Sequence, residues 1–167
     1  MRKTQPKPQK KDHSPFAIEP LESRQLLSAA VIDLLIAYTT AAKTAAGGAS
    51  AIQSQINKAV ADANQVLSNS LIDLTLRLVH SEEVSYSESG SLATDLGRLQ
   101  DPADGQLDTI AAMRDAWGAD LVSLFVASGN SAGISYIMDD PASETNADYA
   151  FSVIRQDSSF HDNCCLE

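Results

Sequence analysis

Two kinds of hydrophobic pattern alternate along the chain from residue 30 onward. Residues 31–38 are almost continuously apolar, which is typical of a strand buried on both faces of a parallel sheet. After Gly47 and Gly48, with Ser50 as a candidate cap, apolar residues recur every three or four positions and predict a long amphipathic helix. The residues of that apolar stripe are Ile52, Ile56, Ala59, Val60, Ala63 and Leu67. The polar positions between them, Asn64 included, are expected to face solvent.

The later segments continue the alternation. Residues 72–78 alternate apolar and polar side chains, which predicts a strand with one buried and one wet face. The elements predicted after it are a helix around residues 92–99, a helix from Leu107 to a stop at Gly118, a buried strand over 121–127, an edge strand over 134–138 and a last strand over 149–154. Strands that alternate with helices predict an α/β fold with a mainly parallel, twisted sheet covered by helices.

Charge divides the chain into two parts. Residues 1–29 hold six basic and three acidic side chains and so carry +3, which leaves −13 on residues 30–167 of a chain whose net charge is −10. An acidic body with scattered basic residues argues against a nucleic-acid partner. No apolar run approaches the roughly 18 residues of a membrane-spanning helix, so no span is expected. We expect residues 1–29 to be a disordered basic segment and residues 30–167 to form one domain.

A short motif ends the basic segment. Residues 21–29 resemble the LEPR-XLL motif found near the N-termini of surface or secreted proteins of planctomycete-type bacteria, with Ser23 in place of the motif's proline. The matching residues are Leu21, Glu22, Arg24, Leu26 and Leu27. The resemblance implies a secreted or cell-surface location in a bacterium. The alternative is a solvated basic tail joined to the first strand.

The order of elements and five local strings resemble the metzincin zinc peptidases, specifically reprolysin-like bacterial metallopeptidases. The strings are VIDLLIAYTTAAKTAAGG from Val31, residues 76–79 before the Ser89, Gly90 and Asp95 segment, MRDAWGADLVSL from Met113, GISYIM from Gly133 and FSV from Phe151. The resemblance covers most of residues 30–160. It implies a truncated metzincin-like peptidase domain over residues 30–167, with an antiparallel edge strand beside the parallel ones.

The family's chemistry depends on a string that these 167 residues do not contain. In that family, the helix after the last strand carries HExxHxxGxxH, whose histidines hold zinc and whose glutamate acts as general base. The histidines of this sequence are His13, His80 and His161, and no two are spaced to share a metal. We therefore assign no catalytic or zinc-binding residue. Zinc is expected for the full-length family domain, and this chain alone is expected to be inactive.

One part of the family's cleft can be transferred by resemblance. In metzincins the edge strand pairs antiparallel with an extended peptide substrate, which would give that role to Gly133, Ile134, Ser135 and Tyr136. The substrate implied is a peptide or protein. The alternative is an ordinary edge strand with no ligand.

Other candidate sites are weaker. His161, Cys164 and Cys165 are three potential zinc ligands, but a cluster so near the end of a sequence is more often a frayed tail. An acidic loop lacks the ligand spacing of a known calcium motif and is more simply a solvated loop. Its residues are Asp139, Asp140, Glu144 and Asp148.

Three functions stay open at this point. The first is the N-terminal part of a secreted zinc endopeptidase, and the second is a non-catalytic, exported α/β binding domain. The third is a von Willebrand A-like module, which is disfavoured because Asp33 is followed by Leu34 and Leu35 instead of Asp-x-Ser-x-Ser. Without the active-site helix, an apolar strip of the sheet would meet water, so self-association is expected.

Overall fold

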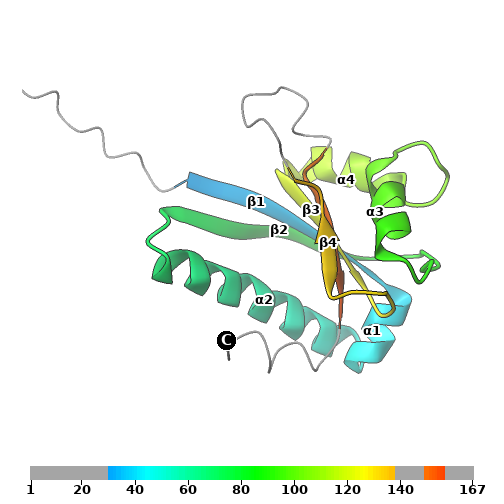
Figure 1. Cartoon of the computed structure of the whole chain (residues 1–167), viewed down its shortest axis with the longest axis horizontal. Coiled ribbons are helices and arrows are strands. Elements are labelled where there is room, and N and C mark those ends of the chain that lie inside the picture. The colour runs from blue at the N-terminus through cyan, green and yellow to red at the C-terminus, as the bar shows by residue number, and fades with distance from the viewer. Residues whose placement is uncertain (1–29, 138–148, 157–167) are drawn as a thin grey trace, which may run out of the picture.

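The computed structural model describes residues 30–137 and 149–156. Its elements are β1 (Ala30–Thr39), α1 (Thr40–Ala46), α2 (Ala49–Asn69), β2 (Leu74–Val84), α3 (Leu92–Gln100), α4 (Thr109–Trp117), β3 (Leu121–Val126), β4 (Gly133–Ser135) and β5 (Phe151–Arg155). The strands form one sheet in the order β2-β1-β3-β5-β4 (Figure 1). Pairing is parallel from β2 to β5, and β4 pairs antiparallel with β5. The predicted fold class is therefore confirmed. The 21–29 motif and the acidic loop lie outside the described residues.

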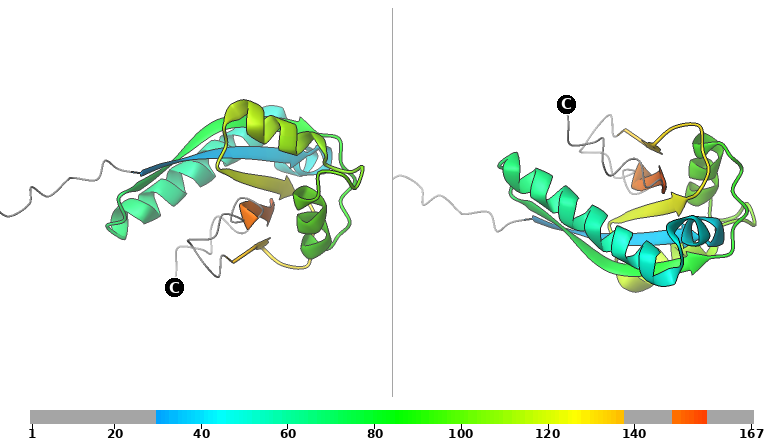
Figure 2. Two further views of the ribbon diagram at one scale, coloured as in Figure 1. Left: turned by 90° about the horizontal axis from the view of Figure 1, so that it is seen from above. Right: turned by 90° about the horizontal axis from the view of Figure 1, so that it is seen from below.

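The core consists of two apolar layers, one on each face of the sheet. Alternate residues of β1 point to opposite faces, so Leu35 and Ala37 enter the cluster with α3 and α4, while Leu34 and Ile36 enter the cluster with α1 and α2. Figure 2 shows α2 along one face and α4 on the other. The central strand is thus buried on both faces, as its apolar run predicts.

The long helix α2 follows its predicted stripe, with two corrections. Ile52 and Ile56 are fully buried. The N-cap is Gly48, not Ser50, and it makes no side-chain cap bond. Asn64 does not face solvent: its Nδ2 donates to the carbonyl of Leu76 at 2.9 Å, and the Leu76 N–H donates to its Oδ1 at 2.7 Å. These two hydrogen bonds hold α2 against β2, and a helical pattern alone could not reveal them.

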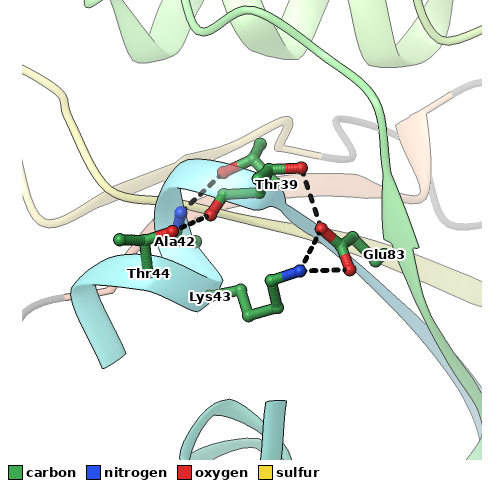
Figure 3. Close-up of polar contacts among 6 residues, drawn as sticks. Thr39, Ala42, Lys43, Thr44 and Glu83 are labelled. Carbon is green, nitrogen blue, oxygen red and sulfur yellow. Dashed lines mark hydrogen bonds and ion pairs between the residues drawn. The ribbon is translucent and has the colours of Figure 1, made fainter. Parts of the chain in front are cut away.

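Helix α1 was not predicted. It begins where β1 ends: Thr39 Oγ1 accepts from the N–H of Ala42 at 2.9 Å, and Gly47 ends the helix at φ 97°. Lys43 Nζ lies 2.6 and 2.7 Å from the two carboxylate oxygens of Glu83 (Figure 3). The helix is too short and too rich in alanine and threonine to show an apolar stripe.

The remaining elements match the sequence with shifted boundaries. Helix α4 ends at Gly118, whose φ of 61° explains why the helix stops there. Trp117 is half exposed, and its ring stacks on that of His80 with centroids 4.3 Å apart. The edge strand is shorter than predicted, since β4 covers only Gly133–Ser135. Among the described residues, no helix is long and apolar enough to cross a membrane.

Candidate functional site

The structure places the predicted cleft residues at the outer edge of the sheet. Gly133, Ile134 and Ser135 form β4, and Tyr136 follows the strand directly (Figure 1). Strand β4 runs antiparallel to β5 from the pair Gly133–Ile154 to the pair Ser135–Ser152. Among residues 30–137 and 149–156, no strand pairs with its other side. An extended chain could join the sheet there.

The hydrogen-bond alternation shows which backbone groups this edge presents. The N–H of Arg155 donates to the carbonyl of Ala132 at 2.8 Å, so these two residues form a hydrogen-bonded pair just before β4. Bonded and non-bonded pairs alternate along an antiparallel ladder, so Ile134 is the next residue bonded to β5. The N–H and carbonyl groups of Gly133 and Ser135 therefore point away from β5.

Hydroxyl groups line up across the strands at this edge. Ser123 of β3 lies beside Ser152 of β5, with 2.6 Å between their Oγ atoms, and Ser152 pairs in register with Ser135 of β4. The three serines share the α2 side of the sheet. They border a cavity of about 220 Å³ that Tyr136 and Tyr149 also line. Nothing in the sequence pattern links the serines, because strand pairing alone brings them together.

The α2 side of β5 is only partly apolar. Ser152 and Ile154 lie on the α2 side, because Phe151 and Val153 belong to the cluster on the other face. Ile154 is 39% exposed. The part of the chain that the structure describes thus presents one large apolar side chain and a row of serines there, instead of the continuous apolar strip expected from sequence.

A buried tyrosine–carboxylate pair supports α3, which contacts β4. Asp95 is fully buried, and its Oδ1 accepts from the hydroxyl of Tyr86 at 2.5 Å and from the N–H of Ser89 at 3.0 Å. Arg98 Nη1 donates to the Tyr86 oxygen at 3.1 Å. Burial, together with the bond to Asp95, raises the pKa of Tyr86 to about 12 although Arg98 opposes the shift. The phenol therefore stays neutral and donates.

The described residues do not fit a zinc ion. Among residues 30–137 and 149–156, no group of three or more His, Cys, Asp or Glu side chains could hold a metal. His80 lies on β2, at the edge opposite β4, with its ring against Trp117 and its Nε2 3.0 Å from Glu82 Oε2. The other histidines and both cysteines lie outside the described residues: His13, His161, Cys164 and Cys165.

The architecture defines a class: an α/β domain whose mainly parallel sheet ends, among the described residues, in a short antiparallel edge strand. Residues 28–162 match the family model described as metallo-peptidase family M12B, reprolysin-like. The chain therefore belongs to the reprolysin-like metallopeptidases, a zinc peptidase family whose substrates are peptides or proteins. The resemblance of residues 30–160 to reprolysin-like metallopeptidases is confirmed.

Curated relatives match about two thirds of the chain. The chain is 40% identical over 106 residues to a peptidyl-Asp metalloendopeptidase of Stenotrophomonas maltophilia strain K279a, covering 64% of this chain and 25% of the relative. It is 37% identical over 108 residues to the enzyme of that name from Xanthomonas campestris pv. campestris, covering 65% and 25%. The chain thus spans about a quarter of the length of these relatives.

A solved structure shows the same fold. The chain resembles one described as the structure of a chaperone-substrate complex, with a TM-score of 0.63 and 20% identity. The match covers 77% of this chain and 23% of the other. At this identity the likeness concerns the fold alone.

Proposed function

We propose that residues 30–156 form the peptide-binding part of a zinc metalloendopeptidase, with β4 as the strand that pairs with substrate. The observation that carries this proposal is the outward direction of the backbone groups of Gly133 and Ser135, on an edge that no other strand of the described part of the chain covers. The family's substrates are peptides, and an extended peptide fits such an edge because its own backbone supplies the complementary groups.

The substrate preference can be proposed from the relatives' names, which describe peptidyl-Asp endopeptidases. A suitable probe is an extended octapeptide with a central aspartate, and the matched probe carries asparagine there. We expect the aspartyl peptide to bind more tightly. Binding is measured by titrating the isotope-labelled 167-residue chain and following its backbone amide signals by NMR.

The expected result is a set of saturable shifts centred on Gly133 and Ser135. These amides point into the space that the peptide would occupy. Shifts confined to the opposite edge, β2, or no shifts at millimolar peptide would contradict the proposal.

A proline substitution separates edge pairing from sheet stability. Ser135→Pro removes an N–H that points away from β5, and proline is tolerated at such edge positions. We expect it to abolish peptide binding and to change the melting temperature little. Ser135→Ala is the control, since it removes the hydroxyl and keeps the N–H. Equal binding by both variants would show that the peptide does not pair with β4.

We also propose that the 167-residue chain binds peptides without cleaving them, because its sequence contains no HExxH string. The test is incubation with casein, with and without added zinc, followed by mass spectrometry. Zinc-dependent cleavage would overturn this part of the proposal. Binding without cleavage is also what the second candidate, a non-catalytic exported binding domain, requires.

Export is the last part of the proposal. It is supported by the resemblance of residues 21–29 to the LEPR-XLL motif and implies a secreted or surface location. A reporter fused behind residues 1–29 should leave the cytoplasm of a planctomycete-type host. Replacement of Leu26 and Leu27 by aspartate should retain it inside, and unchanged export would contradict the role of the motif.

A further inference from the structure

The carboxylate of Glu88 lies where three segments meet. Its Oε1 accepts from the hydroxyl of Thr39 at 2.5 Å and from the N–H of Ala127 at 2.7 Å. Its Oε2 accepts from the N–H of Ser128 at 2.8 Å and from that residue's hydroxyl at 2.6 Å. Glu88 therefore joins the end of β1 to the connection that leaves β3. That connection, residues 127–132, leads directly into β4.

These four donors occupy the acceptor positions of the carboxylate. Burial raises the pKa of Glu88, but the bonds from Ser128, Thr39 and the N–H of Ala127 outweigh it and hold the pKa below its ordinary value. The group is therefore ionised at neutral pH. The Thr39 hydroxyl gives its only proton to Glu88 while its oxygen accepts from Ala42, so the chain of bonds has one direction (Figure 3 shows the Thr39–Ala42 bond).

The rest of the 127–132 connection is also held closely. Gly129 lies against Leu92 of α3, so closely that an added Cβ would lie 2.5 Å from Leu92 Cδ2. Arg155 Nη1 donates to the carbonyl of Gly129 at 3.1 Å, and the Arg155 N–H donates to the carbonyl of Ala132. Of these contacts to the 127–132 connection, those from Glu88 come first along the connection, and they are the ones made by a carboxylate.

We propose that Glu88 is a positioning residue for the substrate edge: by fixing Ala127 and Ser128, it sets where the connection enters β4 and hence where Gly133 and Ser135 present their backbone groups. This inference rests on the proposed function of β4. A hydrogen bond to an ionised acceptor is stronger than one between neutral groups. The loss of the Glu88 carboxylate should therefore loosen the 127–132 connection and β4 before the rest of the sheet.

The test compares Glu88→Gln with Asn64→Ala. The glutamine keeps the shape of the side chain. Its amide NH₂, however, replaces one carboxylate oxygen and cannot accept the hydrogen bonds that this oxygen received. Asn64→Ala removes a comparable pair of side-chain to backbone bonds at the opposite edge, where Asn64 holds Leu76. Both variants of the full chain are studied by amide hydrogen exchange and by binding of the aspartyl octapeptide.

In Glu88→Gln we expect exchange at Ser128, Ile134 and Arg155 to become at least about tenfold faster and peptide affinity to fall by about tenfold, as expected for a lost charge-assisted bond. Leu76 should exchange as in the unmodified chain. Asn64→Ala should show the reverse, with faster exchange at Leu76 and peptide affinity within about twofold of the original. If Glu88→Gln does not fold, Ser128→Ala removes one donor and should give the same pattern more weakly.

The outcomes separate the two proposals. An even acceleration over the whole sheet in Glu88→Gln, no acceleration at Ser128 and Arg155, or unchanged peptide affinity would each overturn the positioning role. If the unmodified chain binds no peptide, the proposed function fails. The local exchange pattern then still decides whether Glu88 fixes the edge.

Discussion

Tyr86 is a single buried residue whose protonation the fold controls. The neutral phenol donates to Asp95, and its raised pKa of about 12 means that folding favours the protonated form. This contribution to stability is fully present below the ordinary tyrosine pKa of 10.0 and is lost as pH rises through about 12. We predict that one of the four tyrosines ionises late in an absorbance titration, and that Tyr86→Phe removes this late step.

Tyr149→Phe is the matched control for that titration. Tyr149 is 42% exposed and takes no part in the bond to Asp95. The late step should persist in this variant. Its loss in Tyr149→Phe, or its survival in Tyr86→Phe, would show that the assignment to Tyr86 is wrong.

Gly129 is required for packing, not for an unusual backbone angle. A methyl group there would lie 2.5 and 2.8 Å from two atoms of Leu92, which is fully buried. We predict that Gly129→Ala lowers the free energy of unfolding by about 1–3 kcal/mol, as overpacking of a core does. Chemical denaturation of the two chains measures this difference in the free energy of unfolding. Gly97→Ala, where an added Cβ meets nothing within 4 Å, should not destabilise the chain, and equal losses in both variants would contradict the packing explanation.

The hydrogen bonds of Glu88 could not be predicted from the sequence. Its partners lie 39, 40 and 49 positions away, and no local spacing announces them. By contrast, Gly133, Ile134 and Ser135 could be named because a short string and its place in the order of elements identify an edge strand. Whether they bind peptide is still a prediction.

At the scale of elements, strong periodicity separates what could be predicted from what could not. The apolar run of β1 and the stripe of α2 are long enough to identify their elements, and both are confirmed. Helix α1 was missed because Ala42 is its only buried residue. The predicted edge strand over 134–138 begins one residue late and ends three residues late relative to β4, because propensity does not show where pairing with β5 ends.

The turn between α2 and β2 contains a local strain that can be removed. Leu71 has φ 57° and is 94% exposed, a position after a helix where glycine is usual. We predict that Leu71→Gly raises the free energy of unfolding by about 0.5–1 kcal/mol, because an L-residue in this conformation costs about that much or more. Leu71→Ala is the control, since it shortens the side chain and keeps the strain. An equal gain in both variants would assign the effect to the exposed leucine.

For the whole molecule, the exposed α2 side of β5 bears on self-association. We propose that copies of the chain associate through the α2 side of β5, where Ile154 is 39% exposed. We predict that sedimentation velocity shows a concentration-dependent oligomer and that Ile154→Ser shifts it toward monomer. Val31→Ser, at a residue 50% exposed elsewhere on the surface, should leave the distribution unchanged. A monomer at all concentrations would contradict the proposal.

The two borders of the sheet are unlike each other. The β2 border is long, carries the Lys43–Glu83 ion pair, and has a register shift in its pairing with β1 between Leu34 and Leu35. Such irregular, charged borders resist pairing with another strand, whereas the proposed function requires the short β4 border to accept one. A fibril built by adding strands needs two compatible borders on every unit. With β4 as the proposed pairing strand, the described part of the chain offers only one such border, so a bound peptide strand would not start a growing stack of copies of this chain.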